Sequence, residues 1–155
     1  MKNQPADALA MLKADHTKVK DLFAQFDGLG ARAHVSKKRI ADQICQELTI
    51  HTQLEEEIFY PAVRDAINDQ DLMDVALVEH AGAKELVAQI SAMEPGDALY
   101  DARVKVLCDQ ILHHVEEEEG TIFPQAQDAG LDMAALGEEM ADLKATLTEE
   151  VSQEE

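Results

Sequence analysis

Two segments of the sequence repeat one pattern of residues that could bind a metal ion. In each, a histidine is followed by a glutamate at the fourth and fifth residues and by a proline at the tenth; the histidines are His51 and His114. On a helix, residues i and i+4 lie one above the other on the same face. Each segment therefore directs an imidazole and a carboxylate the same way.

The repetition extends upstream, where Asp15-His16 and Glu79-His80 each begin a similar segment. After the acid and the histidine, a lysine, a second acid, a leucine, an alanine and a glutamine recur in the same order in both copies. Each copy thus holds one lone histidine and one His-x-x-x-Glu pair. The chain is predicted to be an internal duplication of a helical hairpin.

The spacing of apolar residues predicts the helices that position these side chains. The bundle helices are expected at about residues 6–26, 36–60, 72–93 and 97–123, and a further acidic amphipathic helix is expected from about residue 131. Ser36 and Asp97 are the predicted N-caps, and Pro61 and Pro124 should kink or end their helices.

The fold class that follows is all-α, an antiparallel up-down four-helix bundle built from a duplicated helical hairpin, with a short C-terminal helix. Residues 1–128 are expected to form the bundle domain. Residues 129–155 are expected to form an acidic helix packed on the bundle or on a partner.

Composition narrows the classes of partner. The 155-residue chain has a formal net charge of −19, which disfavours binding to nucleic acid or to an anionic membrane surface. Its apolar runs are too short to span a membrane, and its N-terminus does not resemble a signal peptide. Cys45 and Cys108 are interpreted as reduced thiols and small core residues. A cytoplasmic monomer or weak dimer is expected.

Six ionisable residues fall within otherwise apolar helix faces: His16, His51, Glu55, His80, His114 and Glu118. A single buried histidine is usually a hydrogen-bonded core residue, but burying an ionised carboxylate is costly unless it is paired or bound to a metal. Six duplicated positions therefore favour a metal site. They exceed the needs of one tetrahedral zinc ion, so two ions bridged by both carboxylates are expected. The Glu-x-x-His motif of ferritin-like bundles and the His-Glu-x-x-His motif of zinc proteases do not occur.

The sequence closely resembles the hemerythrin-like (HHE cation-binding) domain family over about residues 12–124. The motifs that carry the resemblance are Asp15-His16, His51-x-x-x-Glu55, Ile58-Phe59-Tyr60-Pro61, Glu79-His80, His114-x-x-x-Glu118 and Ile122-Phe123-Pro124. The resemblance implies a non-haem centre of two Fe ions with an oxo or hydroxo bridge, held by the four histidines and two bridging glutamates. It also implies binding of dioxygen or a related small oxidant, for oxygen binding, storage or sensing.

One position departs from the family pattern. Hemerythrin proper has a second histidine one turn after the helix-3 histidine, where this chain has Lys84. Two octahedral irons would then keep two open positions, where the five-histidine pattern leaves one. The more open site favours solvent ligands, peroxide access and autoxidation over reversible oxygen carriage.

Several alternatives stay open. His34 and His113 are the possible additional histidine ligands, and Glu56 and Glu119 could join the site or orient the histidine rings. An apolar wall of Leu12, Leu48, Leu77 and Ile111 is expected to control access. The chain could instead be a redox enzyme that handles peroxide or nitric oxide, or an iron-donating stress protein, although no general acid or base beyond the ligands is evident. A metal-responsive or oxygen-responsive interaction module is a third reading.

Overall fold

The structure is a computed structural model that describes residues 7–154. Its helices are α1 (Ala8–Asp27), α2 (His34–Leu54), α3 (Tyr60–Ala66), α4 (Gln70–Ser91), α5 (Tyr100–Glu117), α6 (Phe123–Asp128) and α7 (Met133–Glu154). Two short π-helical segments, η1 (Glu55–Phe59) and η2 (Glu118–Ile122), join α2 to α3 and α5 to α6 without a break. The predicted start of the first helix at Ala6 lies outside the described residues.

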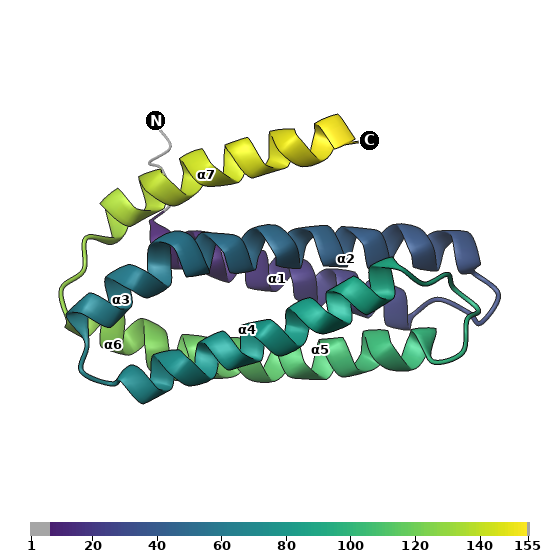
Figure 1. The fold of residues 1–155 in the computed structure, drawn as a ribbon, viewed down its shortest axis with the longest axis horizontal. Helices are drawn as coiled ribbons and strands as arrows, with labels where there is room; N and C mark the ends of the chain where they lie inside the picture. Colours follow the sequence, from purple (N-terminus) through teal and green to yellow (C-terminus); the bar gives the residue numbers. More distant parts are fainter. Residues whose placement is uncertain (1–6, 155) are drawn as a thin grey trace.

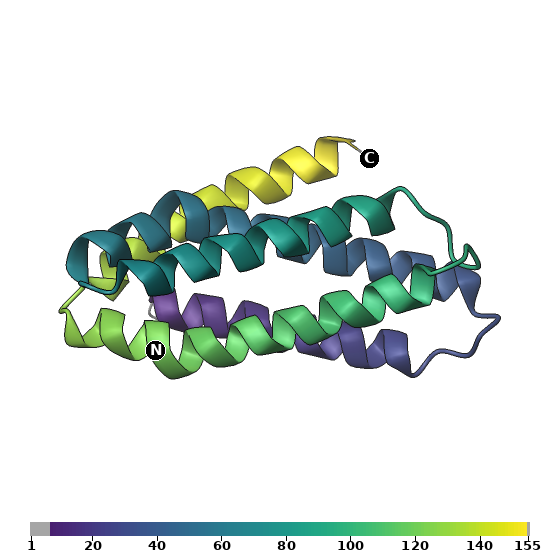
Figure 2. The ribbon, with the colours of Figure 1, turned by 60° about the horizontal axis from the view of Figure 1, so that its bottom comes forward.

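Four long rods form the body of the molecule, and each runs antiparallel to the next along the chain (Figure 1). They are α1, the continuous α2–η1–α3, α4, and the continuous α5–η2–α6; the turn by 60° in Figure 2 shows all four side by side. The prediction of an antiparallel bundle of duplicated hairpins is confirmed. No helix among residues 7–154 is both long enough and apolar enough to cross a membrane.

The predicted N-caps of two helices are wrong. α2 begins at His34, two residues before Ser36, and its cap residue Ala33 makes no side-chain hydrogen bond. α5 begins at Tyr100 after Leu99, whose φ of 72° is left-handed. Asp97 instead accepts a hydrogen bond of 2.8 Å from the Glu94 backbone N–H. A short acidic side chain that bonds its own loop in this way competes with capping a helix.

The two prolines are accommodated by the π-helical segments, not by a break. Proline has no N–H to donate, and in an α-helix its ring clashes with the carbonyl four residues before it. In η1 the Tyr60 N–H donates to the Glu55 carbonyl, five residues back, and in η2 the Phe123 N–H donates to the Glu118 carbonyl. The wider turn precedes Pro61 and Pro124, so each rod continues.

The last helix, α7, has 22 residues and lies within residues 129–155, where an acidic helix is expected from the sequence. It runs obliquely over the bundle in Figure 1 and contacts α1, α2 and η1. Met140 is fully buried and Leu147 is 8% exposed, both within the same apolar cluster as Leu54 and Phe59 of the bundle. The predicted domain boundary at residue 128 coincides with the end of α6, and the division into two domains stays a prediction.

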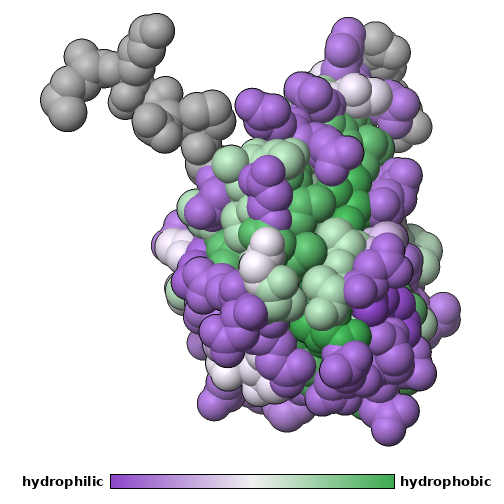
Figure 3. All heavy atoms as spheres, turned by 90° about the vertical axis from the view of Figure 1, so that its left-hand side faces the viewer, coloured by the Kyte–Doolittle hydropathy of each residue, from purple (hydrophilic) through white to green (hydrophobic). Residues whose placement is uncertain are grey.

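The hydrophobic core consists of two clusters, one toward each end of the bundle. One cluster gathers Leu12, Leu54, Phe59 and Phe123 with the buried face of α7, and the other gathers residues around Phe23, Ile44 and Leu107. Figure 3 views the end at which α3, α6 and the start of α7 meet, where hydrophobic side chains reach the surface between hydrophilic ones. The buried histidines and glutamates belong to neither cluster.

Candidate metal centre

The structure brings the six predicted ligand residues together in the interior. They come from all four rods: His16 from α1, His51 from α2, Glu55 from η1, His80 from α4, His114 from α5 and Glu118 from η2. None is more than 6% exposed, and both glutamates are fully buried. Because each glutamate is the first residue of a π-helical segment, the wide turn begins at the centre itself. Such turns are frequent at functional sites.

The six residues form two clusters that share both carboxylates. The first cluster is His16, His51, Glu55 and Glu118, and the second is His80, His114, Glu55 and Glu118. Within each cluster the candidate ligand atoms lie within 4.8 Å of one another. This is the arrangement expected for two metal ions bridged by two glutamates.

The Nε2 atoms of the four histidines face the carboxylates. In the first cluster His16 Nε2 lies 3.1 Å from Glu118 Oε1 and His51 Nε2 lies 3.2 Å from Glu55 Oε1. In the second, His80 Nε2 lies 3.0 Å from Glu55 Oε1 and His114 Nε2 lies 3.0 Å from Glu118 Oε2. The Nε2 atoms are thus the ligand atoms that a metal ion would meet.

The Nδ1 atoms point the other way, and each donates to an acidic side chain. The pairs are His16 with Glu119 at 2.6 Å, His51 with Asp15 at 2.9 Å, His80 with Glu56 at 2.8 Å and His114 with Glu79 at 2.8 Å. A carboxylate on Nδ1 fixes the tautomer, orients the ring and makes Nε2 a better metal ligand. The sequence left two roles open for Glu56 and Glu119, and these hydrogen bonds correspond to the orienting role.

Asp15 and Glu79 play the same role, which was not predicted from the sequence. A signal for it exists, because an acid directly precedes the lone histidine in both copies of the repeat. Asp15 and Glu79 bond the histidine of their own copy, whereas Glu56 and Glu119 bond the lone histidine of the other copy. The two halves of the duplication therefore hold each other's rings in place.

The metal-free centre is a network of charged hydrogen bonds. Burial lowers the pKa of His51, but the Glu55 charge and hydrogen bonds to Asp15 and Glu55 raise it well above its usual value. Burial also opposes protonation of His114, and the Glu118 hydrogen bond and charge raise its pKa to about 9. Burial raises the pKa of Glu118, but the hydrogen bond from His114 and the nearby His16 imidazole hold it well below its usual value. In the metal-free centre, protons on His51 and His114 therefore balance the charge of the carboxylates, a task that metal ions would take over.

Three buried atoms of the centre lack a hydrogen-bond partner: His16 Nε2, Glu55 Oε2 and Glu118 Oε1. The distance of 3.1 Å between His16 Nε2 and Glu118 Oε1 is short enough for an ion pair, but the pair does not meet the angles of a hydrogen bond. Unpaired buried polar atoms are costly. A cation between these atoms would satisfy all three, so the residues present fit a metal ion.

Tyr60 is a further polar residue of the centre, which the sequence analysis placed in the motif without a role. Its hydroxyl lies 3.1 Å from His80 Nε2, 3.2 Å from His114 Nε2 and 2.5 Å from Glu118 Oε2. Burial, followed by the charges of Glu55 and Glu118, raises its pKa well above the usual value. The hydroxyl therefore stays protonated at neutral pH.

The duplication pairs Tyr60 with Phe123, because each directly precedes the proline of its repeat. Phe123 stacks on the His16 ring at 6.0 Å between centroids, with the two rings nearly parallel. The second cluster thus has a hydroxyl where the first has only an aromatic hydrocarbon. Comparing the two copies position by position is the signal that could have found this difference.

The other candidate ligands lie outside both clusters. His34 lies at the start of α2. Its ring is so close to Gly96, in the loop before α5, that a Cβ on Gly96 would lie 3.1 Å from it. His113 is 72% exposed, and its Nε2 is 3.7 Å from Glu79 and Glu117. Lys84 is 53% exposed and its Nζ bonds Glu56 Oε1 at 2.6 Å. Lys84 therefore supports the acid that orients His80 and does not face the centre.

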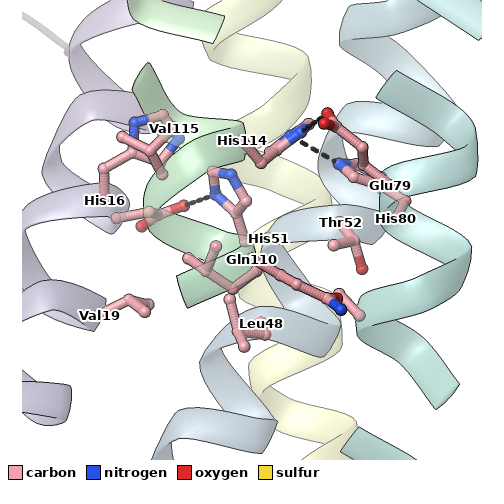
Figure 4. Close-up of a pocket in the computed structure, with 13 residues that line it drawn as sticks. His16, Val19, Leu48, His51, Thr52, Glu79, His80, Gln110, His114 and Val115 are labelled. Carbon is pink, nitrogen blue, oxygen red and sulfur yellow. Dashed lines mark hydrogen bonds and ion pairs between the residues drawn. The ribbon is translucent and has the colours of Figure 1, made fainter. Parts of the chain in front are cut away.

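A cavity of about 20 Å³ lies beside the histidines, which is enough room for a water molecule. Figure 4 shows it with His16, Val19 and Val115 on one side and Thr52, Glu79 and His80 on the other. Leu48 and Ile111 line it as predicted, and Leu12 is fully buried. Leu77 is 37% exposed and does not line the cavity, so its predicted place in the wall is wrong. The buried counterpart of Leu12 on α4 is Ala76, four residues before His80.

Comparisons with known proteins agree with this architecture. A crystal structure of a hemerythrin HHE cation binding domain-containing protein from Mycobacterium kansasii superposes with a TM-score of 0.78 at 22% identity, covering 92% of this chain and 87% of that one. At this identity the likeness shows the fold alone.

A protein of Nostoc sp. named DNA nickase is 32% identical over 113 residues, which are 73% of this chain and 31% of that protein. The chain therefore spans about a third of the length of this curated relative. The family model described as the hemerythrin HHE cation binding domain matches residues 7–126. With a match over most of its length, a four-rod bundle and two buried His/Glu clusters, the chain belongs to the hemerythrin HHE cation-binding domain family.

Proposed function

We propose that this protein holds two iron ions and binds dioxygen or a related small oxidant between its four rods. The observation that carries the proposal is the pair of buried clusters that share Glu55 and Glu118, each with two histidines. Imidazole with carboxylate suits iron, manganese and zinc. Iron is favoured because a site with few protein ligands per ion leaves positions open, and open positions on iron bind and reduce oxidants.

In this proposal the residues of the chain have distinct tasks. His16 and His51 would hold one ion, His80 and His114 would hold the other, and the two glutamates that both clusters share would contribute to both sites. When bound, the iron pair supplies electrons to the oxidant. The bundle supplies burial, since all six side chains are at most 6% exposed, and burial keeps water and bulky reductants from the centre.

Tyr60 adds a proton donor at the second cluster. Its hydroxyl is within hydrogen-bond distance of His80 Nε2 and His114 Nε2, the two imidazoles that would hold the second ion. A protonated hydroxyl there can donate to an oxygen atom on which negative charge develops. The first cluster, next to Phe123, offers no such donor.

This donor gives weight to a second candidate function, a di-iron redox enzyme that turns over peroxide or nitric oxide. Breaking an O–O bond needs a proton at the departing oxygen, and the Tyr60 hydroxyl is placed to supply one. The expectation that only the ligands could serve as acid or base overlooked this residue. A role as an iron-donating stress protein or a responsive interaction module rests on no comparable observation.

We do not extend DNA nicking to this chain. The relative with that name is about three times as long as the matched segment, and a net charge of −19 repels a polyanion. Dioxygen, peroxide or nitric oxide is the proposed small-molecule partner, and a monomer or weak dimer is the proposed state in solution.

The experiment that tests the proposal is metal analysis with visible spectra taken before anaerobic reduction, after it, and after return to air. Two irons per chain with a band that appears with dioxygen and leaves on its removal support oxygen binding. Two irons that pass directly to a stable ferric spectrum, with turnover of added peroxide, support the enzyme. Zinc alone, or a chain that folds without taking up iron, would contradict both.

Tyr60→Phe separates the two functions. The substitution removes only the hydroxyl, so iron content should stay the same. We expect peroxide turnover to fall by about 100-fold, within the range of a positioned acid. The binding of dioxygen should weaken about tenfold, as for one lost hydrogen bond to a charged group. The control is Tyr100→Phe, because Tyr100 lies in the other apolar cluster.

A further inference from the structure

We propose that small oxidants reach the centre through one side of the bundle, the wall between α2 and α4 at Leu48, Thr52 and Ala83, and that the wall between α1 and α5 is closed. The inference rests on the proposed function, since it names the entrance to the same site. Nothing in the duplication itself requires one side to differ from the other. The difference comes from three pairs of residues that the two copies do not share.

The cavity beside the histidines is lined almost entirely by residues that the duplication relates in pairs. Each residue of α1 matches a residue of α4, as His16 matches His80, and each residue of α2 matches one of α5, as His51 matches His114. The wall between α2 and α4 is therefore the counterpart of the wall between α1 and α5. The protein supplies its own comparison of two walls around one centre.

The wall between α2 and α4 has the smaller side chains. Ala83 on α4 corresponds to Val19 on α1, and one turn further along Val87 corresponds to Phe23. Thr52 and its counterpart Val115 have nearly the same shape. The two walls therefore differ in side-chain volume mainly between α4 and α1. Val19 and Phe23 are 3% and 5% exposed, which means that both larger side chains fill the interior.

A groove on the surface meets the thinner wall. It has a volume of about 380 Å³ and lies between α2 and α4, where Leu48, Thr52 and Ala83 line both the groove and the cavity. These three side chains are at most 5% exposed, so a single layer of small or flexible side chains separates the groove from the cavity. On the opposite side, a depression between α1 and α5 shares only Val115 with the cavity.

Movement of side chains suffices to open such a layer. Local openings of a buried layer are slower than rotamer changes of exposed residues, and they are drawn from weakly packed regions. The groove is lined by Val87 and Ala88 as well as by the Lys84–Glu56 ion pair. A neutral diatomic molecule can pass a gap that excludes a hydrated ion or a larger reductant. The proposed entrance is thus selective by size and by charge.

The test copies the closed wall onto the open one. In Ala83→Val/Val87→Phe, each new residue is the one that α1 carries at the matching position. The probe is nitric oxide mixed with the reduced, iron-loaded protein in a stopped-flow instrument. We expect association and dissociation both to slow by about tenfold, which is a barrier higher by about 1.4 kcal/mol, while the equilibrium affinity stays within about twofold.

The matched control is Val19→Ala, which thins the opposite wall at the position equivalent to Ala83. We expect it to leave the association rate nearly unchanged, because Phe23 and Val115 still close that side. Unchanged rates in the double variant, or equal effects of the two substitutions, would overturn the proposal. Since added bulk in a packed core can cost stability, Val87→Phe alone, at the half-buried outer position, repeats the test in a milder form.

A second readout needs no iron. In crystals of the iron-free protein pressurised with xenon, we expect a xenon atom in the groove beside Leu48 and Ala83, and its loss in Val87→Phe. Xenon beside Val115, or at neither wall, would overturn the entrance. If the protein proves not to bind iron, the xenon result still decides the entrance, so failure of the proposed function and failure of this inference are told apart.

Discussion

Asp15 and Glu79 play the same part in the two halves of the molecule, but different residues hold them. Asp15 accepts from His51 through one oxygen and from Lys144 of α7 at 2.8 Å through the other. Burial raises the Asp15 pKa, and hydrogen bonds from His51 and Lys144 bring it below its usual value. Among residues 7–154, the second oxygen of Glu79 pairs only with the exposed His113, at 3.7 Å. The cluster that contains His51 is therefore linked to α7 through Asp15, whereas the cluster that contains His114 is linked through Glu79 to a solvent-exposed side chain.

Substituting these acids one at a time should weaken the two metal positions separately. In Asp15→Asn we expect the affinity for the ion held by His51 to fall by about 10–100-fold, because the ring loses its charged acceptor. Glu79→Gln should do the same for the ion held by His114. Competition with a chelator, followed by metal counting, measures both. Asp21→Asn on the exposed face of α1 is the control, and equal affinities in Asp15→Asn and Asp21→Asn would contradict the prediction.

The π-helical segments are the elements that set the geometry of the centre. Each begins at a glutamate that both clusters share and ends just before the residue that precedes a proline. In η1 the wide turn places Tyr60 over Glu55, with its backbone N–H on the Glu55 carbonyl and its hydroxyl 3.4 Å from Glu55 Oε1. The wide turn of η1 thus brings a candidate ligand and the first residue of α3, Tyr60, to the centre together.

Pro61→Ala should separate stability from metal binding. Proline is about 3 kcal/mol worse than alanine inside a helix, so we expect the iron-free protein to unfold at the same or a higher temperature. Metal affinity should fall, because an α-helical turn would move Glu55 and Tyr60 relative to His51. Thermal unfolding and chelator competition measure the two effects, with Pro95→Ala in the loop before α5 as control. Lower stability with full metal affinity would refute this account of the turn.

α7 is part of the folded bundle according to its packing. Met140 is fully buried, in the same cluster as Phe59 and Phe123, so Met140→Ala should cost about 2–5 kcal/mol of unfolding free energy. Urea unfolding followed by circular dichroism measures it. Glu139→Ala, an exposed neighbour, is the control and should change stability by less than about 0.5 kcal/mol. If α7 belonged to a partner instead, the bundle would unfold at the same urea concentration in both variants.

At the scale of the whole molecule, pH should act oppositely on the metal-free and metal-bound protein. The His114 pKa of about 9 lies above its unfolded value of about 6.5. Its contribution to the stability of the metal-free protein is therefore fully present below about pH 6.5 and is lost as the pH rises through about 9. Metal ions need unprotonated Nε2 atoms, so metal affinity should rise over the same interval.

Two measurements check this pair of expectations. The unfolding free energy of the metal-free protein should be lower at pH 9 than at pH 6.5. Binding of cobalt(II) at pH 7 in a weak buffer should release about two protons per chain, since His51 and His114 both carry raised pKa values. Release of no protons, or a metal-free protein that is more stable at pH 9, would show that the histidines are neutral before metal binds.

The sequence by itself determined the duplication, the four rods and the six buried histidines and glutamates. These follow from local order, because a helix turns by a fixed angle per residue and the spacing of four between His51 and Glu55 places both on one face. A buried charge is costly, so six of them at duplicated positions predicted a shared metal site. The lysine at position 84 likewise shows, from the sequence alone, that the second histidine of hemerythrin proper is absent at that position.

Only the tertiary structure decided what the rods do to one another. Tyr60 of one copy contacts His80 of the other, and Lys144 bonds Asp15. Ala83 lines the cavity together with residues of α2. All of these involve residues far apart in the chain. The predicted place of Leu77 was wrong for the same reason. The predicted cap at Asp97 was wrong for a local reason, because that side chain bonds the backbone of its own loop. Spacing along a helix fixes which side chains share a face, but which face meets which neighbour depends on how whole helices pack.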